Sequence, residues 1–118
     1  MKPLIALFLA MCSLQVAAQA EQLPMEAFNP SSLSEGAVLL DVRTPAEFNE
    51  GHLPGAVNID WFADDFNSRL EDIPKDAEIY LYCKKGGRSA RASERLLTLG
   101  YTRVVDLTGG YDAYQPGQ

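Results

Sequence analysis

Metal-ligating residues are scarce in this chain of 118 residues, which has two cysteines and a single histidine. A protein zinc site needs three or four Cys, His or carboxylate ligands held close together. No such cluster can be assembled around so few cysteines and histidines, so we expect no bound metal. The sequence also lacks a Gly-rich nucleotide-binding motif, and we expect the protein to work without a cofactor.

Basic residues and long apolar runs are also few. Ten Lys and Arg stand against sixteen Asp and Glu, for a formal net charge of −6 at pH 7. An acidic protein is a poor partner for nucleic acid or an anionic membrane surface, and we expect it to bind neither. The apolar run over residues 4–14 is too short to span a bilayer.

The N-terminal segment has the pattern of a secretory signal peptide. Lys2 precedes the apolar run, and Ala18-Gln19-Ala20 follows it with small residues at the two positions that a signal peptidase reads. We expect residues 1–20 to be cleaved off, leaving residues 21–118 as one domain with no membrane attachment. Cleavage two residues earlier and an uncleaved membrane anchor are the alternatives.

Removal of that segment takes Cys12 and leaves Cys83 as the only cysteine. A single cysteine in an exported domain cannot form an internal disulfide, so its thiol is free or pairs with another molecule. A buried cysteine that acts as a small apolar side chain is the alternative. The position of Cys83, between the apolar run 79–82 and Gly86-Gly87-Arg88, favours a reactive thiol where a strand crosses to a helix.

The segment that begins at Cys83 is suited to hold negative charge. Backbone amides at a helix N-terminus point into the preceding loop, and the helix dipole favours an anion there. Two glycines allow the positive φ that a curled loop requires, and three basic side chains add charge. We expect Cys83 to be partly thiolate at neutral pH and to be the catalytic residue. The predicted substrate-binding residues are Lys84, Lys85, Gly86, Gly87, Arg88 and Ser89.

Strands and helices alternate along the chain. Continuous apolar runs are typical of strands buried on both faces, and such alternation predicts a parallel sheet with helices on both faces. Ligands of these sheets bind beyond the carboxyl ends of the strands, where Cys83 falls. The predicted strands are 37–40, 56–59, 78–82 and 104–107, the predicted helices are 44–51, 61–70 and 89–99, and residues 21–34 form a lead-in with at most a short strand or turn.

Two of these helices are predicted from specific signals. Thr44 is an N-cap, Pro45 occupies the first helical position and Glu47 closes a capping box. Residues 61–70 place Phe62, Phe66 and Leu70 on one face at i, i+4 and i+8.

Asp41 and Arg43 are supporting candidates for the site. Asp41 ends a strand at the carboxyl edge and could reach the site, but capping or pairing with Arg43 is an equal alternative. We expect Arg43 to pair with Glu47 in a structural role. His52 is the only histidine, and its place before Leu-Pro-Gly favours a role in a turn over that of a general base.

Three blocks of the chain together resemble a rhodanese (sulfurtransferase) domain. Residues 40–59 resemble the N-terminal signature of that family, Tyr82-Cys83 through Arg88-Ser89 its active-site loop, and residues 104–114 its C-terminal signature. One departure is Tyr114, where the family usually has tryptophan. A single exported copy is most similar to the small periplasmic, phage-shock-type thiosulfate sulfurtransferases.

The resemblance implies a rhodanese-like three-layer α/β fold and a two-step sulfur transfer. Cys83 would take a sulfane sulfur from thiosulfate or a similar small anionic donor and hold it as a persulfide. Cyanide, a thiol or a protein acceptor would then remove it. Arg88 would order the loop or contact the donor, while Lys84 and Lys85 would steer anions. The resemblance also implies a periplasmic location, and we expect a monomer.

Two other functions remain open. Cysteine phosphatases and arsenate reductases also place a thiolate below amides and an arginine, but five residues separate the two in their loops, against four between Cys83 and Arg88. A non-turnover persulfide carrier, which hands its sulfur to a partner, would keep the same loop. Turnover with free thiosulfate and a small acceptor separates an enzyme from a carrier.

Overall fold

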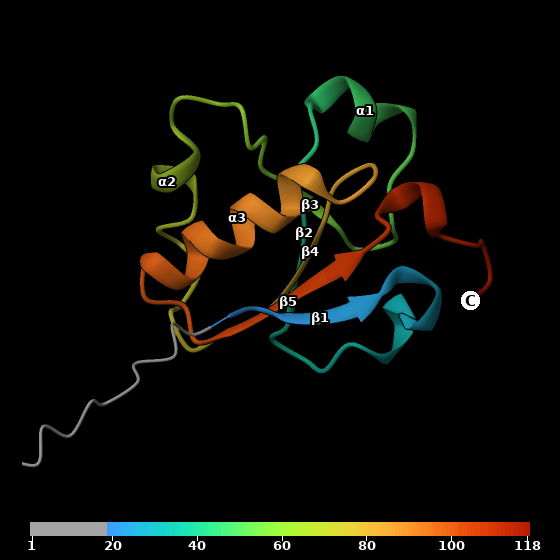
Figure 1. Cartoon of the computed structure of the whole chain (residues 1–118), viewed down its shortest axis with the longest axis horizontal. Helices are drawn as coiled ribbons and strands as arrows, with labels where there is room; N and C mark the ends of the chain where they lie inside the picture. Colours follow the sequence, from blue (N-terminus) through green and yellow to red (C-terminus); the bar gives the residue numbers. More distant parts are fainter. Residues whose placement is uncertain (1–18) are drawn as a thin grey trace, which may run out of the picture.

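A computed structural model describes residues 19–118 and shows a five-stranded parallel sheet (Figure 1). Residues 1–18, which hold most of the predicted signal peptide, lie outside the described part of the chain. All strand pairs are parallel, in the order β1-β5-β4-β2-β3. The strands are β1 (Glu21–Pro24), β2 (Val38–Asp41), β3 (Val57–Asn58), β4 (Glu78–Tyr82) and β5 (Arg103–Thr108).

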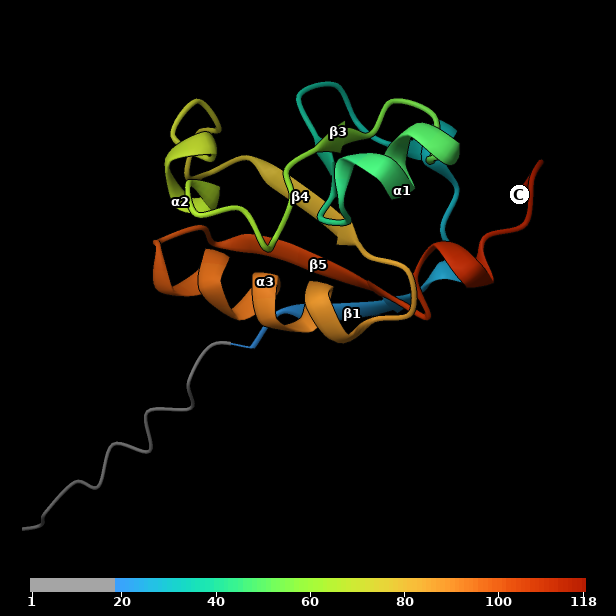
Figure 2. The ribbon, with the colours of Figure 1, turned by 90° about the horizontal axis from the view of Figure 1, so that it is seen from above.

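Helices and turns cover both faces of the sheet, as expected for the α/β class. The longest, α3 (Gly87–Thr98), runs along β5 (Figure 2), and α2 (Phe66–Arg69) shares its face. The opposite face is covered by the 3-10 turns η1 (Met25–Ala27) and η3 (Tyr111–Ala113). The remaining elements are α1 (Pro45–Glu50) and η2 (Pro30–Ser32). The three-layer arrangement predicted from the alternation of strands and helices is therefore confirmed.

The apolar run Ile79–Tyr82 of the central strand β4 is explained by its burial on both faces of the sheet. Ile79 and Leu81 are buried beneath α2 and α3, whereas Tyr82 is buried on the face of η1 and η3. A parallel strand buried on both faces has no polar side to alternate with. Because β4 lies between β2 and β5, the residue that follows it, Cys83, emerges at the middle of the carboxyl edge.

The predicted helix over residues 61–70 is wrong over its first half. Only Phe66–Arg69 is helical, and Phe62 is 67% exposed, although Phe66 is buried. Asp60 explains the difference, because its side chain accepts a hydrogen bond from the Phe62 amide at 2.9 Å. An Asp side chain that bonds a nearby amide offers the backbone a turn in place of a helix.

The start of α1 agrees with its prediction. The Thr44 hydroxyl accepts from the Glu47 amide, and the Glu47 carboxylate accepts from the Thr44 amide, which is a complete capping box. The third helix begins at Gly87, two residues before its predicted start. Among the described residues, no helix has the length and apolar character needed to cross a membrane.

Candidate active site

The carboxyl ends of three neighbouring strands form the candidate active site. Asp41 ends β2, Cys83 follows β4 and Gly109 follows β5. The sheet therefore brings together the three sequence blocks that hold the candidate residues. A loop at such an edge, followed by a helix N-terminus, is where α/β proteins bind ligands.

The Cys83 sulfur lies inside the turn of its own loop. Cys83 is only 1% exposed, and the Gly86 amide donates to Sγ at 3.0 Å. The Ser89 hydroxyl lies 3.6 Å from the same sulfur. An amide donor and a helix N-terminus both favour negative charge on sulfur, so the geometry suits a thiolate nucleophile.

Only one of the two loop glycines is required by the backbone. Gly86 has φ of +130°, which an L side chain rarely adopts, and this turn aims its amide at Cys83. Gly87 has no positive φ, and a Cβ added there would meet no atom within 4 Å. The prediction that Gly87 supplies an unusual φ is therefore wrong, because Gly87 is already the first residue of α3.

Arg88 joins the loop to α1 through a two-pronged ion pair. Its guanidinium donates to the two carboxylate oxygens of Glu47 at 2.6 and 3.0 Å. The expected pair of Arg43 with Glu47 is therefore wrong. The pairing of Glu47 with Arg88 could not be predicted from the sequence, because the two residues lie 41 positions apart in the chain. The Arg88 contact lowers the pKa of Glu47 from 4.5 to about 2, with help from Thr44.

This lowered pKa predicts an acid-sensitive contribution to stability. The Glu47 carboxylate is ionised more readily in the folded than in the unfolded state, so its contribution is full above about pH 4.5 and is lost as the pH falls through about 2. Glu47→Gln keeps a side chain that can close the capping box and is expected to reduce the free energy of unfolding at pH 7 by about 1–2 kcal/mol, since the pair is partly exposed. Urea unfolding at several pH values measures this.

The exposed carboxylate of Glu94 on α3 supplies the control for that series. Glu94→Gln should leave the pH dependence of unfolding unchanged. If Glu47→Gln and the parent protein lose stability equally between pH 4.5 and 2, the ion pair with Arg88 does not contribute as described.

Asp41 and Arg43 form a buried ion pair beside the site, which confirms one of the two alternatives for Asp41. Asp41 is 0% and Arg43 3% exposed, and Arg43 donates from Nη2 to Asp41 Oδ2 at 2.7 Å. Arg43 also donates to the Gly51 carbonyl at 2.6 Å and lies 4.4 Å from the centre of the Tyr111 ring. These contacts join β2 to the chain after α1 and to the C-terminal segment. The pair therefore holds three segments together next to the candidate active site.

The C-terminal segment holds the Cys83 loop by its backbone. The Tyr111 amide donates to the Cys83 carbonyl at 2.8 Å, and the Asp112 amide donates to the Lys84 carbonyl at 3.0 Å. Lys84 Nζ also bonds the Asp112 carboxylate at 2.8 Å. Sequence reasoning missed these partners, because β5 and η3 reach the loop only through the order of strands in the sheet.

Lys85 and His52 complete the set of sequence candidates. Lys85 is exposed, and no ion pair of its side chain occurs among residues 19–118. The His52 ring stacks on Phe48 at 3.6 Å between centroids, and its Nδ1 lies 2.9 Å from the Phe48 carbonyl. Both contacts hold the turn after α1, in line with the structural role favoured for His52.

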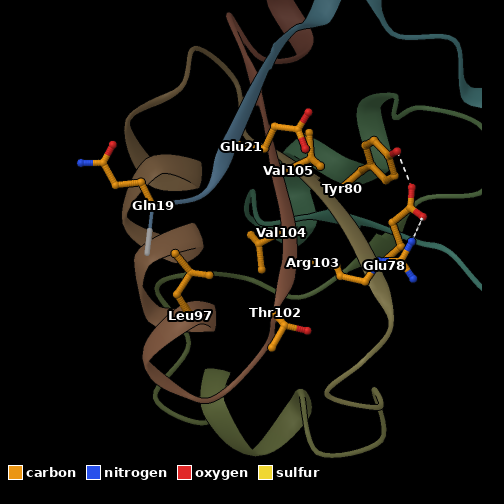
Figure 3. A pocket seen from close by; sticks show the side chains of 9 residues that line it. All are labelled: Gln19, Glu21, Glu78, Tyr80, Leu97, Thr102, Arg103, Val104 and Val105. Carbon is orange, nitrogen blue, oxygen red and sulfur yellow. Dashed lines mark hydrogen bonds and ion pairs between the residues drawn. The ribbon is translucent and has the colours of Figure 1, made fainter. Parts of the chain in front are cut away.

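Two hollows lie at opposite ends of the sheet. One, of about 270 Å³, lies next to the loop and includes Arg43, Lys84 and Asp112 in its wall. The other, of about 370 Å³, lies at the amino ends of β4 and β5, where Glu78 binds both Tyr80 and Arg103 (Figure 3). Because Cys83 follows the far end of β4, the hollow in Figure 3 is remote from the thiol.

Within residues 19–118, no three side chains of the His, Cys, Asp or Glu type lie close enough to share a metal ion.

A comparison with known families identifies the fold. Residues 29–116 match the model of the rhodanese-like domain. The chain belongs to the rhodanese-like family. A rhodanese-like protein of Staphylococcus aureus has the same fold, with a TM-score of 0.71 at 28% identity, over 82% of this chain and 93% of that one.

Curated relatives of this rhodanese-like chain include named sulfurtransferases. A sulfurtransferase of Allochromatium vinosum is 38% identical over 69% of this chain and 74% of its own. Thiosulfate sulfurtransferase 16 of Arabidopsis thaliana is 37% identical over 70% of this chain and 77% of its own. Other relatives are much longer: the chain spans 19% of the adenylyltransferase and sulfurtransferase UBA4 of Candida albicans. Sulfur transfer is the reaction class that these relatives support.

Proposed function

We propose that this rhodanese-like protein is a thiosulfate sulfurtransferase in which Cys83 carries the transferred sulfur. The observation that supports this most directly is the 3.0 Å hydrogen bond from the Gly86 amide to Cys83 Sγ. A backbone donor aimed at sulfur stabilises the thiolate that must attack the donor molecule. Lys84, Lys85, Gly86, Gly87, Arg88 and Ser89 form the substrate-binding loop in this proposal.

The proposed cycle has two steps and is redox-neutral overall. The Cys83 thiolate attacks the sulfane sulfur of thiosulfate, a new S–S bond forms to Cys83, and the old S–S bond breaks with its electron pair leaving on sulfite. Cyanide carbon or a thiolate then attacks the outer sulfur, and the electron pair of the Cys83 S–S bond returns to Cys83. Amides of the loop stabilise the charge on the outer sulfur of the persulfide.

Loop size and burial favour this function over a cysteine phosphatase or arsenate reductase. Four residues separate Cys83 from Arg88, one fewer than in those loops, and Arg88 is held by Glu47 rather than free to clamp a tetrahedral anion. Cys83 is also only 1% exposed, which suits delivery of a single sulfur atom.

The proposal extends to location and subfamily. The predicted leader over residues 1–20 supports an exported, periplasmic protein of the phage-shock type that acts as a monomer. An acidic chain whose basic residues gather around one loop is suited to a small anionic donor. A small thiol, cyanide or a protein thiol would accept the sulfur.

Thiocyanate formation from thiosulfate and cyanide tests the proposal. The mature protein is expected to form thiocyanate, and Cys83→Ser is expected to form none above the uncatalysed rate. Ser93→Ala is a matched control, because this buried hydroxyl lies on α3, which follows the loop, and makes no hydrogen bond to Cys83. Phosphate ester hydrolysis without thiocyanate would contradict the proposal.

Intact mass spectrometry distinguishes a persulfide carrier from an enzyme. A protein that gains one sulfur atom from thiosulfate at Cys83, but forms no thiocyanate, would be a persulfide carrier that needs a protein acceptor. A protein that neither gains sulfur nor forms thiocyanate would overturn thiosulfate as the donor.

Steering of the donor by the two lysines leads to a specific prediction. Lys84 is paired with Asp112, whereas Lys85 has no ion pair in the described part of the chain. Lys85→Gln is therefore expected to raise the KM for thiosulfate by about threefold at low salt and to weaken its salt dependence, with kcat nearly kept. Lys84→Gln should have the smaller effect. Equal KM values in parent and Lys85→Gln at low ionic strength would refute steering.

A further inference from the structure

A further hollow, the β1–α3 hollow, lies between the edge strand β1 and the helix α3. Its volume of about 710 Å³ is within the range of small-molecule sites. β1 pairs with β5, and α3 runs along these strands (Figure 2). The described residues that line the hollow include none of the loop 83–89, so it is separate from the candidate active site. Its wall includes Ala90, Ser93, Glu94 and Leu97 of α3 and Asp106 of β5.

Two buried polar side chains in this wall lack hydrogen-bond partners. Asp106 is 4% exposed and Ser93 is 2% exposed. Neither Asp106 Oδ1 nor Ser93 Oγ has a partner among residues 19–118. Buried polar atoms in folded proteins are normally paired, because an unpaired one keeps the full cost of its lost hydration. Two such side chains beside one hollow indicate a ligand that brings hydrogen-bond donors to them.

The wall of the β1–α3 hollow carries negative charge only. Among the described residues that line it, Glu94 and Asp106 are acidic and none is basic. Neither carboxylate forms an ion pair within residues 19–118. The register neighbours of Asp106 in the sheet, Gln22 on β1 and Leu81 on β4, are uncharged. Burial raises the pKa of Asp106, as expected for a carboxyl group without a counter-charge. A bound cation would supply that charge.

An ammonium group matches these acceptors better than a metal ion or a neutral donor. It has three N–H donors and no acceptor, so one group can serve both a carboxylate and a hydroxyl oxygen. Hard metal ions need several oxygen ligands, and no cluster of three acidic, His or Cys side chains occurs in the described part of the chain. A neutral donor would leave the carboxylate charge unbalanced. Ala90 and Leu97 in the same wall suit a hydrocarbon part of the ligand.

We propose that the β1–α3 hollow binds a small organic ammonium ion, with the charged group on Asp106 and the hydrocarbon part against Leu97. The exposed carboxylate of Glu94 adds attraction at the rim. The side chains that hold the ligand lie within residues 21–118, so cleavage of the expected signal peptide leaves them in place. The inference does not depend on sulfur transfer, because the hollow and the Cys83 loop share no lining residue.

Binding of n-butylamine, compared with binding of butan-1-ol, tests the proposal. The two probes have the same carbon chain, but only the amine is charged at pH 7. Titration of the ¹⁵N-labelled full chain at constant ionic strength measures both dissociation constants from amide chemical shifts. The amine is expected to bind about tenfold more tightly than the alcohol, with its largest shifts in α3 and β5. Equal binding of the two probes, or amine shifts confined to the Cys83 loop, would overturn the proposal.

Variants of the wall locate the charge that the amine recognises. Asp106→Asn keeps the shape of the side chain and is expected to weaken n-butylamine binding about tenfold, with butan-1-ol binding unchanged. Glu94→Gln should weaken amine binding by about threefold, because its carboxylate is exposed. Glu26→Gln is the matched control, since it removes an exposed carboxylate of η1 on the other face of the sheet.

The outcomes of this series separate the site from general attraction to an acidic protein. The same amine affinity in Asp106→Asn and Glu26→Gln would refute the site. If Asp106→Asn does not fold, the comparison of the two probes on the parent protein decides, and equal binding there overturns the proposal. Neither probe is a sulfur donor, so failure of the amine site would leave the proposed sulfur transfer untouched.

Discussion

Replacing Gly110 with alanine is expected to lower the free energy of unfolding by about 2–5 kcal/mol and to abolish most sulfur transfer. Gly110 has φ of +65°, and a Cβ there would lie 2.4 Å from the Lys84 carbonyl oxygen and 2.6 Å from that of Cys83. Both oxygens are backbone atoms of the candidate active-site loop. The loop must therefore move away from η3, which breaks its hydrogen bonds to the Tyr111 and Asp112 amides.

The matched control for this prediction is Gly55→Ala. Gly55 also has a positive φ, +80°, but a Cβ there would meet nothing within 4 Å. Its cost is limited to the backbone term of about 1–2 kcal/mol, and sulfur transfer should be unaffected. Urea unfolding followed by Trp61 fluorescence compares the two variants. Similar losses of stability in both variants would show that the close approach of Gly110 to the loop does not contribute to the free energy of unfolding.

The second large effect is expected at the buried ion pair of Asp41 with Arg43. Asp41→Ala leaves the Arg43 guanidinium buried without its carboxylate, and the Gly51 carbonyl and the Tyr111 and Tyr82 rings remain as its partners. Breaking one side of a buried pair costs about 3–5 kcal/mol. We expect this loss in urea unfolding, together with reduced sulfur transfer, because Tyr111 also holds the Cys83 carbonyl.

An exposed ion pair of the same chain is the control. Asp65, which precedes α2, and Arg69, which ends it, are each more than half exposed in their side chains and are joined at 3.0 Å. Asp65→Ala is expected to cost less than about 1 kcal/mol, because exposed pairs are screened by water and salt. A loss at Asp41 no larger than that at Asp65 would show that burial does not control the strength of these pairs.

Local sequence signals predicted much of the fold. The apolar runs located β2, β4 and β5, because a strand buried on both faces has no alternative pattern. The capping box located α1, because Thr44 and Glu47 meet within one helical turn. Residues 61–70 were predicted wrongly, because helical spacing of apolar residues competed with the turn that Asp60 forms with Phe62.

The candidate active site was likewise predicted in part. The Cys83 loop was located from a thiol, glycines and charges that are adjacent in the chain, and the turn at Gly86 bears this out. The ion pair of Arg88 with Glu47 was not predicted, because Arg43 lies only four positions from Glu47 in the chain and was the expected partner.

The amino-acid sequence by itself therefore determined most of the strands and helices and where the Cys83 loop begins, because these depend on contacts within one turn or one strand. Only the tertiary structure decided which charged side chains form ion pairs and which segments hold the Cys83 loop. Glu47 reaches Arg88, and Gly110 lies against the Lys84 and Cys83 carbonyls, only because β2, β4 and β5 lie side by side. Strand order is a property of the packed sheet, and a side-chain pair between strands has no local signature along the chain.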